Sequence, residues 1–185
     1  CAGSFDMGCT PGQSGCQADE SPVTPVTLTR NYYVSQTEVT QGQYQALMGS
    51  HPSACTACVP DTPVEMVSWD MAAAYANELS AADGFADCYR CTGSGSSTSC
   101  ELAVDVYVCE GYRLPTEAEW EGAARCGEDL LYAGSTTIGD VAWHAGNSSA
   151  TPHSVAGLDA NACGLFDMSG NVQEWTQDLY DASAY

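Results

Sequence analysis

The cysteines are the first residues in this sequence whose type and spacing could carry out chemistry. Among 185 residues the chain has 11 cysteines, at positions 1, 9, 16, 55, 58, 88, 91, 100, 109, 126 and 163. Two pairs, CTAC (55–58) and CYRC (88–91), have the CxxC spacing that could give zinc four thiolate ligands. The stretch between the two pairs is longer than in a compact zinc ribbon, and other cysteines crowd the second pair. We therefore expect disulfides and not a zinc site.

The cysteines also indicate a compartment. An acidic, lysine-free chain with many cysteines is typical of an exported protein in an oxidising environment: extracellular, at the cell surface or periplasmic. The expected disulfides are Cys9–Cys16, Cys55–Cys58 and Cys126–Cys163, with two further bonds among the four cysteines within residues 85–110. Cys1 is then left over. It could carry a lipid anchor, pair with a segment outside this chain, or simply be where the chain begins.

The charge of the chain excludes several classes of partner. Twenty-four acidic residues face four basic ones, all arginine, which gives a formal net charge of -20. Phosphate backbones and anionic lipids would be repelled, so we expect no nucleic-acid binding and no docking on a membrane through a basic patch. No apolar run approaches the roughly 20 residues of a membrane span. The expected partner is a protein, a glycan or a second copy of the chain.

Short strands and one capped helix are expected in the first 50 residues. Residues 2–8 and 22–39 alternate apolar and polar side chains, as strands do. Thr40 and Gln43 have the spacing of a capping box, which predicts a helix over residues 41–48. The glycine that follows, at position 49, would end this helix.

Two further helices are marked by their caps. Ser68 is a suitable N-cap for a helix that ends near Gly84. Thr116 and Glu119 form a second capping box, and Gly127 would end that helix.

Loops are expected to dominate the rest of the chain. The cysteine-rich insert 85–110 has a Gly/Ser-rich centre, which is not expected to form core. Beyond residue 128 turn signals recur every few residues. The predicted class is a loop-rich, disulfide-stapled α+β fold in a single domain over residues 1–185.

Five segments of the sequence resemble one known family. They are GSFDMG (3–8), TEVTQGQYQALMG (37–49), PVEMVSWDMAAAYANELS (63–80), GYRLPTEAEWEGAAR (111–125) and GLFDMSGNVQEWTQD (164–178). In type and order they resemble the formylglycine-generating-enzyme (sulfatase-modifying factor) domain family. The resemblance implies a compact, irregular α+β domain similar to the C-type lectin fold, which agrees with the class expected from the residues alone.

The sequence departs from the catalytic members of that family in two ways. The family continues beyond the position of Tyr185 with an RGGSW-like segment and a copper-binding cysteine pair, so we expect a domain truncated at its C-terminal end. Gln173 stands where catalytic members have an active-site tryptophan. The resemblance therefore implies a non-catalytic binding or structural module. The alternative is a copper-dependent oxidase that converts protein cysteine to formylglycine, with its catalytic cysteines in the later segment.

The resemblance also implies a structural calcium site. Its ligands would be the side chains of Asp167 and Glu174 and the backbone carbonyls of Gly170 and Val172. A second family site would begin at Asn147. Calcium takes about six to eight hard oxygen ligands, and a glycine-containing turn between two carboxylates can surround one ion. Because two nearby carboxylates repel each other without a cation, we expect calcium to stabilise this loop.

Overall fold

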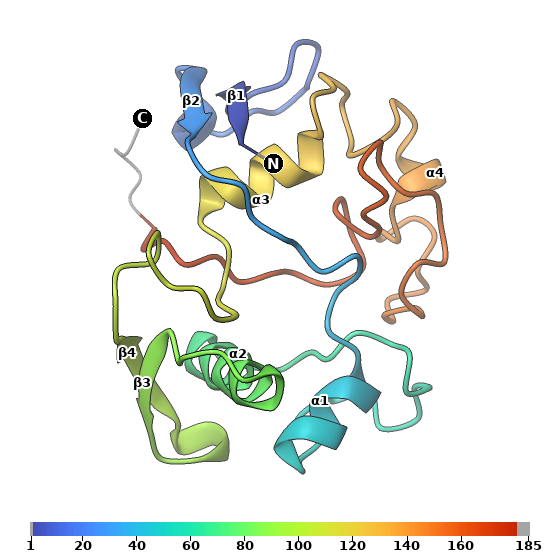
Figure 1. Ribbon diagram of the computed structural model, residues 1–185. Coiled ribbons are helices and arrows are strands. Elements are labelled where there is room, and N and C mark those ends of the chain that lie inside the picture. Colours follow the sequence, from blue (N-terminus) through green and yellow to red (C-terminus); the bar gives the residue numbers. More distant parts are fainter. Residues whose placement is uncertain (1, 181–185) are drawn as a thin grey trace. The chain divides into compact units, whose positions relative to one another are not determined.

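The computed structural model describes residues 2–180, which form two compact units (Figure 1). The first unit comprises residues 1–38, 115–171 and 178–185, and the second comprises 39–114 and 172–177. Both mix short helices and strands with long loops and carry disulfides, so the predicted loop-rich α+β class is confirmed.

A two-stranded antiparallel sheet opens the first unit. Strand β1 (Gly3–Met7) pairs with β2 (Thr24–Leu28), with Phe5 opposite Val26. The predicted first strand is thus confirmed, but the predicted strand over 22–39 is wrong beyond Leu28. The partner strand β1 is only five residues long, so no ladder continues past Leu28 although the alternating pattern does.

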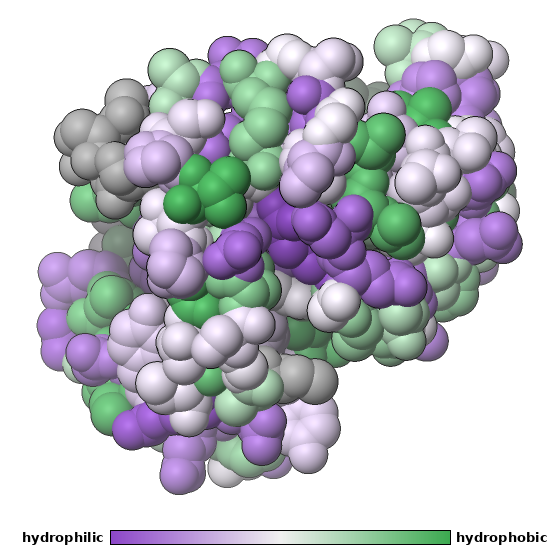
Figure 2. Space-filling view, turned by 90° about the horizontal axis from the view of Figure 1, so that it is seen from above, coloured by the Kyte–Doolittle hydropathy of each residue, from purple (hydrophilic) through white to green (hydrophobic). Residues whose placement is uncertain are grey.

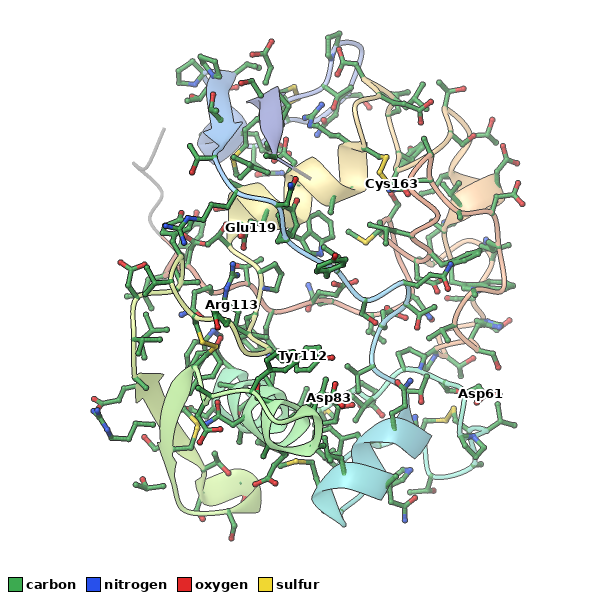
Figure 3. The ribbon with its side chains drawn as sticks, in the orientation of Figure 1. Asp61, Asp83, Tyr112, Arg113, Glu119 and Cys163 are labelled. Atoms are coloured by element: carbon green, nitrogen blue, oxygen red, sulfur yellow. A yellow bond between two sulfur atoms is a disulfide. The ribbon has the colours of Figure 1, made fainter. Side chains whose placement is uncertain are left out.

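Helix α3 (Glu117–Arg125) packs beneath this sheet. The predicted capping box is confirmed, because Thr116 and Glu119 exchange both side-chain-to-backbone hydrogen bonds (Figure 3). The helix ends one residue earlier than expected, at Cys126, which takes the left-handed conformation with a φ of 48°. A Cβ added at Gly122 would lie 3.0 Å from Leu28 Cδ1, so this glycine lets β2 approach the helix closely.

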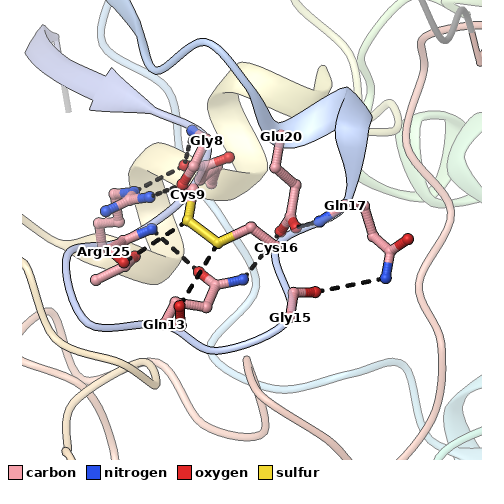
Figure 4. The surroundings of a disulfide bond; sticks show 10 residues. Gly8, Cys9, Gln13, Gly15, Cys16, Gln17, Glu20 and Arg125 are labelled. Atoms are coloured by element: carbon pink, nitrogen blue, oxygen red, sulfur yellow. Dashed lines mark hydrogen bonds and ion pairs between the residues drawn. A yellow bond between two sulfur atoms is a disulfide. The ribbon is translucent and has the colours of Figure 1, made fainter.

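The loop between β1 and β2 contacts α3 through charged side chains and is closed by a disulfide of its own (Figure 4). The Arg125 guanidinium donates to the carbonyl of Gly8 and lies 2.7 Å from Glu121, whose carboxylate accepts from the Gly8 amide. Cys9 and Cys16 close the loop, which contains the 3₁₀ turn η1 (Ala18–Glu20). The arginine side chain is 14% exposed, so this ion pair is largely shielded from solvent.

Two helices form one side of the second unit. Helix α1 (Gln41–Met48) starts with the predicted capping box at Thr40 and ends at Gly49, whose φ is 68°. Helix α2 (Trp69–Asp83) starts at the predicted N-cap, where the Ser68 hydroxyl accepts from the Met71 amide, and is followed by a glycine with a φ of 78°. Both predicted helices are confirmed.

A hairpin lies against the other side of α2 (Figure 1). Strand β3 (Tyr89–Thr92) pairs with β4 (Ser99–Leu102), and the 3₁₀ turn η2 (Gly95–Ser97) joins them. The expectation that the Gly/Ser-rich centre of the insert forms no core is confirmed, because residues 92–97 are exposed, whereas residues near the start of the insert do form core. Cys88 and Tyr89 are 0% and 2% exposed and pack against small side chains of α2.

Disulfides account for ten of the eleven cysteines. Cys9–Cys16, Cys55–Cys58 and Cys126–Cys163 are confirmed, and the insert contains Cys88–Cys109 and Cys91–Cys100. The four cysteines of the two CxxC sequences are therefore all bonded in disulfides, which overturns the zinc alternative. The expectations for Cys1 lie outside the described residues.

The surface of one face mixes polar and apolar groups. Figure 2 shows strongly hydrophilic residues gathered between hydrophobic ones on this face. Within residues 2–180, no helix combines the length and the hydropathy that a bilayer crossing requires.

Candidate metal-binding site

The loops after α3 in the first unit are anchored by one buried asparagine. The amide nitrogen of Asn161 donates to the carbonyls of Ala123 and Ala124, at 2.8 and 3.0 Å, in the last turn of α3. Its side-chain oxygen accepts from the backbone amides of Cys163 and Leu165. The side chain thus satisfies two carbonyls at a helix end, where such groups lack partners within the helix, and two amides of the loop. The Cys126–Cys163 disulfide closes the same region (Figure 3).

A second asparagine holds two of these loops together. The Asn171 side-chain oxygen accepts from the His153 amide at 3.0 Å, and its nitrogen donates to the His153 carbonyl and to Glu38. Its backbone amide donates to the carbonyl of Trp143 at 2.8 Å. The residue has a φ of 62°, a conformation that asparagine adopts more readily than most residues. Loop 142–157 and the predicted metal-binding segment are therefore fixed to one another.

Gly170 is required by close packing. A Cβ at this position would lie 2.4 Å from the Trp143 carbonyl oxygen and 3.1 Å from the Ala142 side chain. Any other residue would displace backbone, so this predicted ligand also lets the segment approach the preceding loop.

Asp167 has the most unusual environment of the predicted ligands in this unit. The residue is 4% exposed and takes the left-handed conformation, with a φ of 61°. One carboxylate oxygen, Oδ2, accepts from the Ala156 amide at 2.8 Å, whereas the buried Oδ1 has no hydrogen-bond partner within the described residues. Burial raises the pKa of this carboxyl, and the Ala156 hydrogen bond lowers the pKa by less. The arrangement leaves one carboxylate oxygen available for a cation or a proton.

A tryptophan lies in the same loops, at position 143. The Trp143 ring stacks on His153 with 3.8 Å between ring centroids. The tryptophan Nε1 is buried without a hydrogen-bond partner among residues 2–180, and a Cβ added at Gly157 would lie 3.2 Å from it. Gly157 directly follows Ala156, the residue that donates to Asp167. No periodicity or spacing in the sequence marks this juxtaposition, because loop packing creates it.

The other two predicted ligands lie in the second unit. Val172 and Glu174 belong to the segment 172–177. Within that unit, the indole of Trp175 donates to the Val67 carbonyl at 3.0 Å, and the indole of Trp69 donates to the carbonyl of residue 176 at 2.9 Å. The four ligands predicted for the first calcium site all lie within residues 167–174, and the boundary between the units falls after residue 171.

Asn147 has a structural role in the first unit. Its side-chain oxygen accepts from the His144 amide at 2.7 Å, and its nitrogen donates to the Ala142 carbonyl at 2.9 Å. Both polar atoms of the side chain therefore close a turn. Asn147 stays a predicted ligand on the resemblance alone.

The donor atoms around Asp167 suit a hard cation. Over residues 2–180, no three His, Cys, Asp or Glu side chains gather in a group that could hold a metal ion. The donor that the structure identifies at Asp167 is its own carboxylate, which is a ligand for calcium and not for soft metals. This donor fits the ion that the sequence predicts.

Comparison with known families gives the identity of the domain. Residues 1–185 match the family described as "Sulfatase-modifying factor enzyme 1-like domain". The chain belongs to this family. The predicted resemblance is thereby confirmed, and the loops that carry Asp167 and Asn171 are part of a sulfatase-modifying-factor domain.

Individual proteins that are similar to this chain in sequence or structure support the family assignment. Chaperone protein LppX of Paenibacillus barcinonensis is 32% identical over 178 residues, which cover 81% of this chain and 62% of that protein. The formylglycine-generating enzyme of Mycobacterium tuberculosis is 40% identical over 83 residues, which cover 36% of this chain and 27% of the enzyme. The solved Treponema denticola variable protein 1 has a TM-score of 0.77 and 30% identity, with 97% of this chain and 73% of that chain covered. This chain thus spans less than two thirds of LppX.

Proposed function

We propose that this domain is an exported, calcium-stabilised and non-catalytic binding or structural module of the sulfatase-modifying-factor family. Its partner would be a protein, a glycan or a second copy of the chain. The observation that carries the calcium part is the buried, unpartnered Oδ1 of Asp167. The disulfides, dense for a chain of 185 residues, support an oxidising compartment: extracellular, at the cell surface or periplasmic.

The cysteines and one substitution support a non-catalytic role. Ten cysteines are bonded in local disulfides, so none of these ten offers a thiolate for copper. Gln173 occupies the position of the active-site tryptophan that the family resemblance implies for catalytic members. A fixed frame with long variable loops suits recognition.

The residues around Asp167 would hold the cation as follows. The Ala156 amide orients the carboxylate through Oδ2 and leaves Oδ1 for the ion. Gly170 would contribute its carbonyl, and Asn171 fixes the backbone between them and the neighbouring loop. When bound, calcium supplies the positive charge that a buried carboxylate otherwise lacks. Val172 and Glu174 are the further ligands proposed from the resemblance.

Calorimetry with and without calcium tests this proposal. The melting temperature of the wild-type chain in EDTA should rise when calcium is added in excess, because a ligand that binds only the folded state stabilises it. Asp167→Asn should abolish most of that rise. Asp159→Asn, which removes an exposed carboxylate from the same unit, should leave it intact. An equal rise in all three chains, or none in the wild type, would exclude a site at Asp167.

The second candidate function is the copper-dependent oxidase that converts protein cysteine to formylglycine. The similarity to the Mycobacterium tuberculosis enzyme favours it. The catalytic cysteines would then lie in a segment after Tyr185. The decisive experiment is to supply copper(I) and oxygen to the full-length protein with a cysteine-containing sulfatase peptide and to follow the peptide by mass spectrometry. Formation of formylglycine would establish the enzyme and overturn the non-catalytic proposal.

A further inference from the structure

A groove in the second unit is lined by none of the residues proposed to bind calcium. It has a volume of about 630 Å³ and is framed by α1, α2 and the hairpin β3–β4. The side chains of Tyr44, Met48 and Met71 contribute its apolar part, from the two helices. Aromatic rings and the flexible thioethers of methionine adapt well to the aliphatic stems of other side chains.

The walls of this groove are fixed by contacts within the unit. The Asn77 side chain exchanges two hydrogen bonds with the backbone of Tyr89, at 2.8 and 3.1 Å, which pins β3 to α2. The Cys91–Cys100 disulfide joins the two strands of the hairpin. On the other side, the Tyr44 ring stacks on Tyr75 of α2, with centroids 5.5 Å apart. A preformed groove loses little conformational entropy when it binds a ligand.

The charged side chains of the groove are predominantly negative. The side chains of Glu78 and Asp87 line it and are exposed. These two carboxylates make no hydrogen bond or ion pair with the described residues. The basic residue in the lining, Arg90, is paired with Glu101 at 2.7 Å. Glu78 lies on α2, and Asp87 lies just before β3, which the two Asn77 hydrogen bonds hold to α2. A cation placed over the groove would therefore meet two acids whose charge no neighbouring side chain neutralises.

We propose that this groove binds a lysine- or arginine-bearing segment of a partner protein. The aliphatic stem of the basic residue would lie on Met48 and Met71, and its charged end would reach Glu78 and Asp87. This proposal rests on the proposed function as a binding module. It also names the chemistry of the partner, which that function leaves open.

A second copy of the chain is a poor occupant. Each copy has a formal charge of -20 and no lysine, so two copies repel one another. Of the four arginines, Arg90 is itself part of the groove, and Arg125 is 14% exposed and bonded to Gly8 and Glu121. Arg30 and Arg113 also have partners within the chain. The occupant is therefore a different, basic chain.

The test is a titration of the ¹⁵N-labelled domain, in calcium, with two pentapeptides. The probe is acetyl-Ala-Lys-Leu-Lys-Ala-amide, and its control has glutamine in place of both lysines. We expect the lysine peptide to shift the amide signals of residues lining the groove. The Glu78→Gln/Asp87→Asn double variant should bind it about tenfold more weakly, since each exposed ion pair contributes up to about 1 kcal/mol.

The matched control is Asp61→Asn/Glu110→Gln, which removes the same charge from exposed sites in the same unit outside the groove. Equal weakening in both double variants, or shifts spread over the surface, would show a non-specific charge effect and overturn the proposal. Groove shifts with a neutral oligosaccharide and none with the lysine peptide would also overturn it, in favour of a glycan. The calcium and formylglycine experiments are read independently, so failure here leaves the proposed function standing.

Discussion

The two units of this domain hold their loops in different ways. In the first unit, the long loops after α3 depend on single buried polar side chains, above all Asn161, and on the Cys126–Cys163 disulfide. In the second unit, a helix with small buried side chains packs against a hairpin, and the Cys88–Cys109 and Cys91–Cys100 disulfides close the insert. Both units also contain a small apolar core, and the first differs in holding its long loops through buried polar side chains.

This difference has a functional side. A loop whose backbone is fixed by a few buried polar side chains can hold a buried carboxylate in place. It can do so even when one carboxylate oxygen, such as Oδ1 of Asp167, has no hydrogen-bond partner among the described residues. A helix and a hairpin instead give rigid walls, which suit a groove. Matched substitutions in the two units test this difference.

Replacing the anchor of the first unit should have the largest effect. Asn161→Ala leaves two buried helix carbonyls and two partly buried loop amides without their partners. At about 1 kcal/mol or more for each group, it should lower the free energy of unfolding by about 4 kcal/mol or more. Asn77→Ala in the second unit removes two hydrogen bonds, and the helix and hairpin remain packed, so the loss should be about 1–2 kcal/mol. Urea unfolding measures both. Similar losses would contradict the contrast between the units.

Removing one disulfide from each unit should have the next largest effects. Replacing Cys126 and Cys163 by serine opens a loop with a sequence separation of 37, and replacing Cys91 and Cys100 opens one of 9. Loop entropy alone predicts losses of about 4 and about 3 kcal/mol. We expect a gap of at least this size, because the hairpin keeps its ladder when its disulfide is removed. Thermal unfolding of both double variants measures the two losses of stability. A smaller loss for the Cys126/Cys163 variant than for the Cys91/Cys100 variant would contradict this expectation.

A methyl group at Gly170 should have a smaller effect. Gly170→Ala places a Cβ against the Trp143 carbonyl and should cost about 1–3 kcal/mol through displaced backbone. Gly139 lies in the short helix α4 (Ile138–Val141) of the same unit, and a Cβ there meets nothing within 4 Å. Gly139→Ala should therefore be neutral or stabilising. Comparable losses in both variants would mean that close packing at Gly170 is not what matters.

The smallest expected effect is a pH dependence in calcium-free protein. Burial raises the pKa of Asp167, so its carboxyl stays protonated to a higher pH in the folded chain than in the unfolded chain, where its pKa is about 3.9. As the pH rises through that window, the unfolded state binds fewer protons than the folded state, and the free energy of unfolding falls. Asp167→Asn should lack this component. Identical pH profiles of stability for the two chains in EDTA would contradict it.

Local signals made much of the fold predictable. Capping residues at Thr40, Ser68 and Thr116 fix three helices, because a cap acts within one turn. The extent of β2 was not predictable from residues 22–39, because a strand also needs a partner of equal length. The core role of Tyr89 was missed because it depends on packing against α2, which composition does not show.

The candidate site was predictable only in part. The resemblance singled out Asp167 and Gly170, but not that Oδ1 lacks a partner or that Trp143 packs against the same loop. Both of these features arise where segments that are distant in the sequence pack together. The groove was missed for the same reason, because Glu78 and Asp87 come from separate elements.

The division of the chain between the two units has a consequence for the order in which the domain matures. Neither unit is a continuous stretch, since residues 172–177 complete the second unit only after the last long loop of the first. Four of the disulfides in the described part of the chain close separations of 21 residues or fewer. Closing these four short loops costs less chain entropy than closing the separation of 37 residues between Cys126 and Cys163. In oxidative folding the four short-range bonds therefore have the lower entropic barrier, and each of them limits the conformations that the rest of the chain must search.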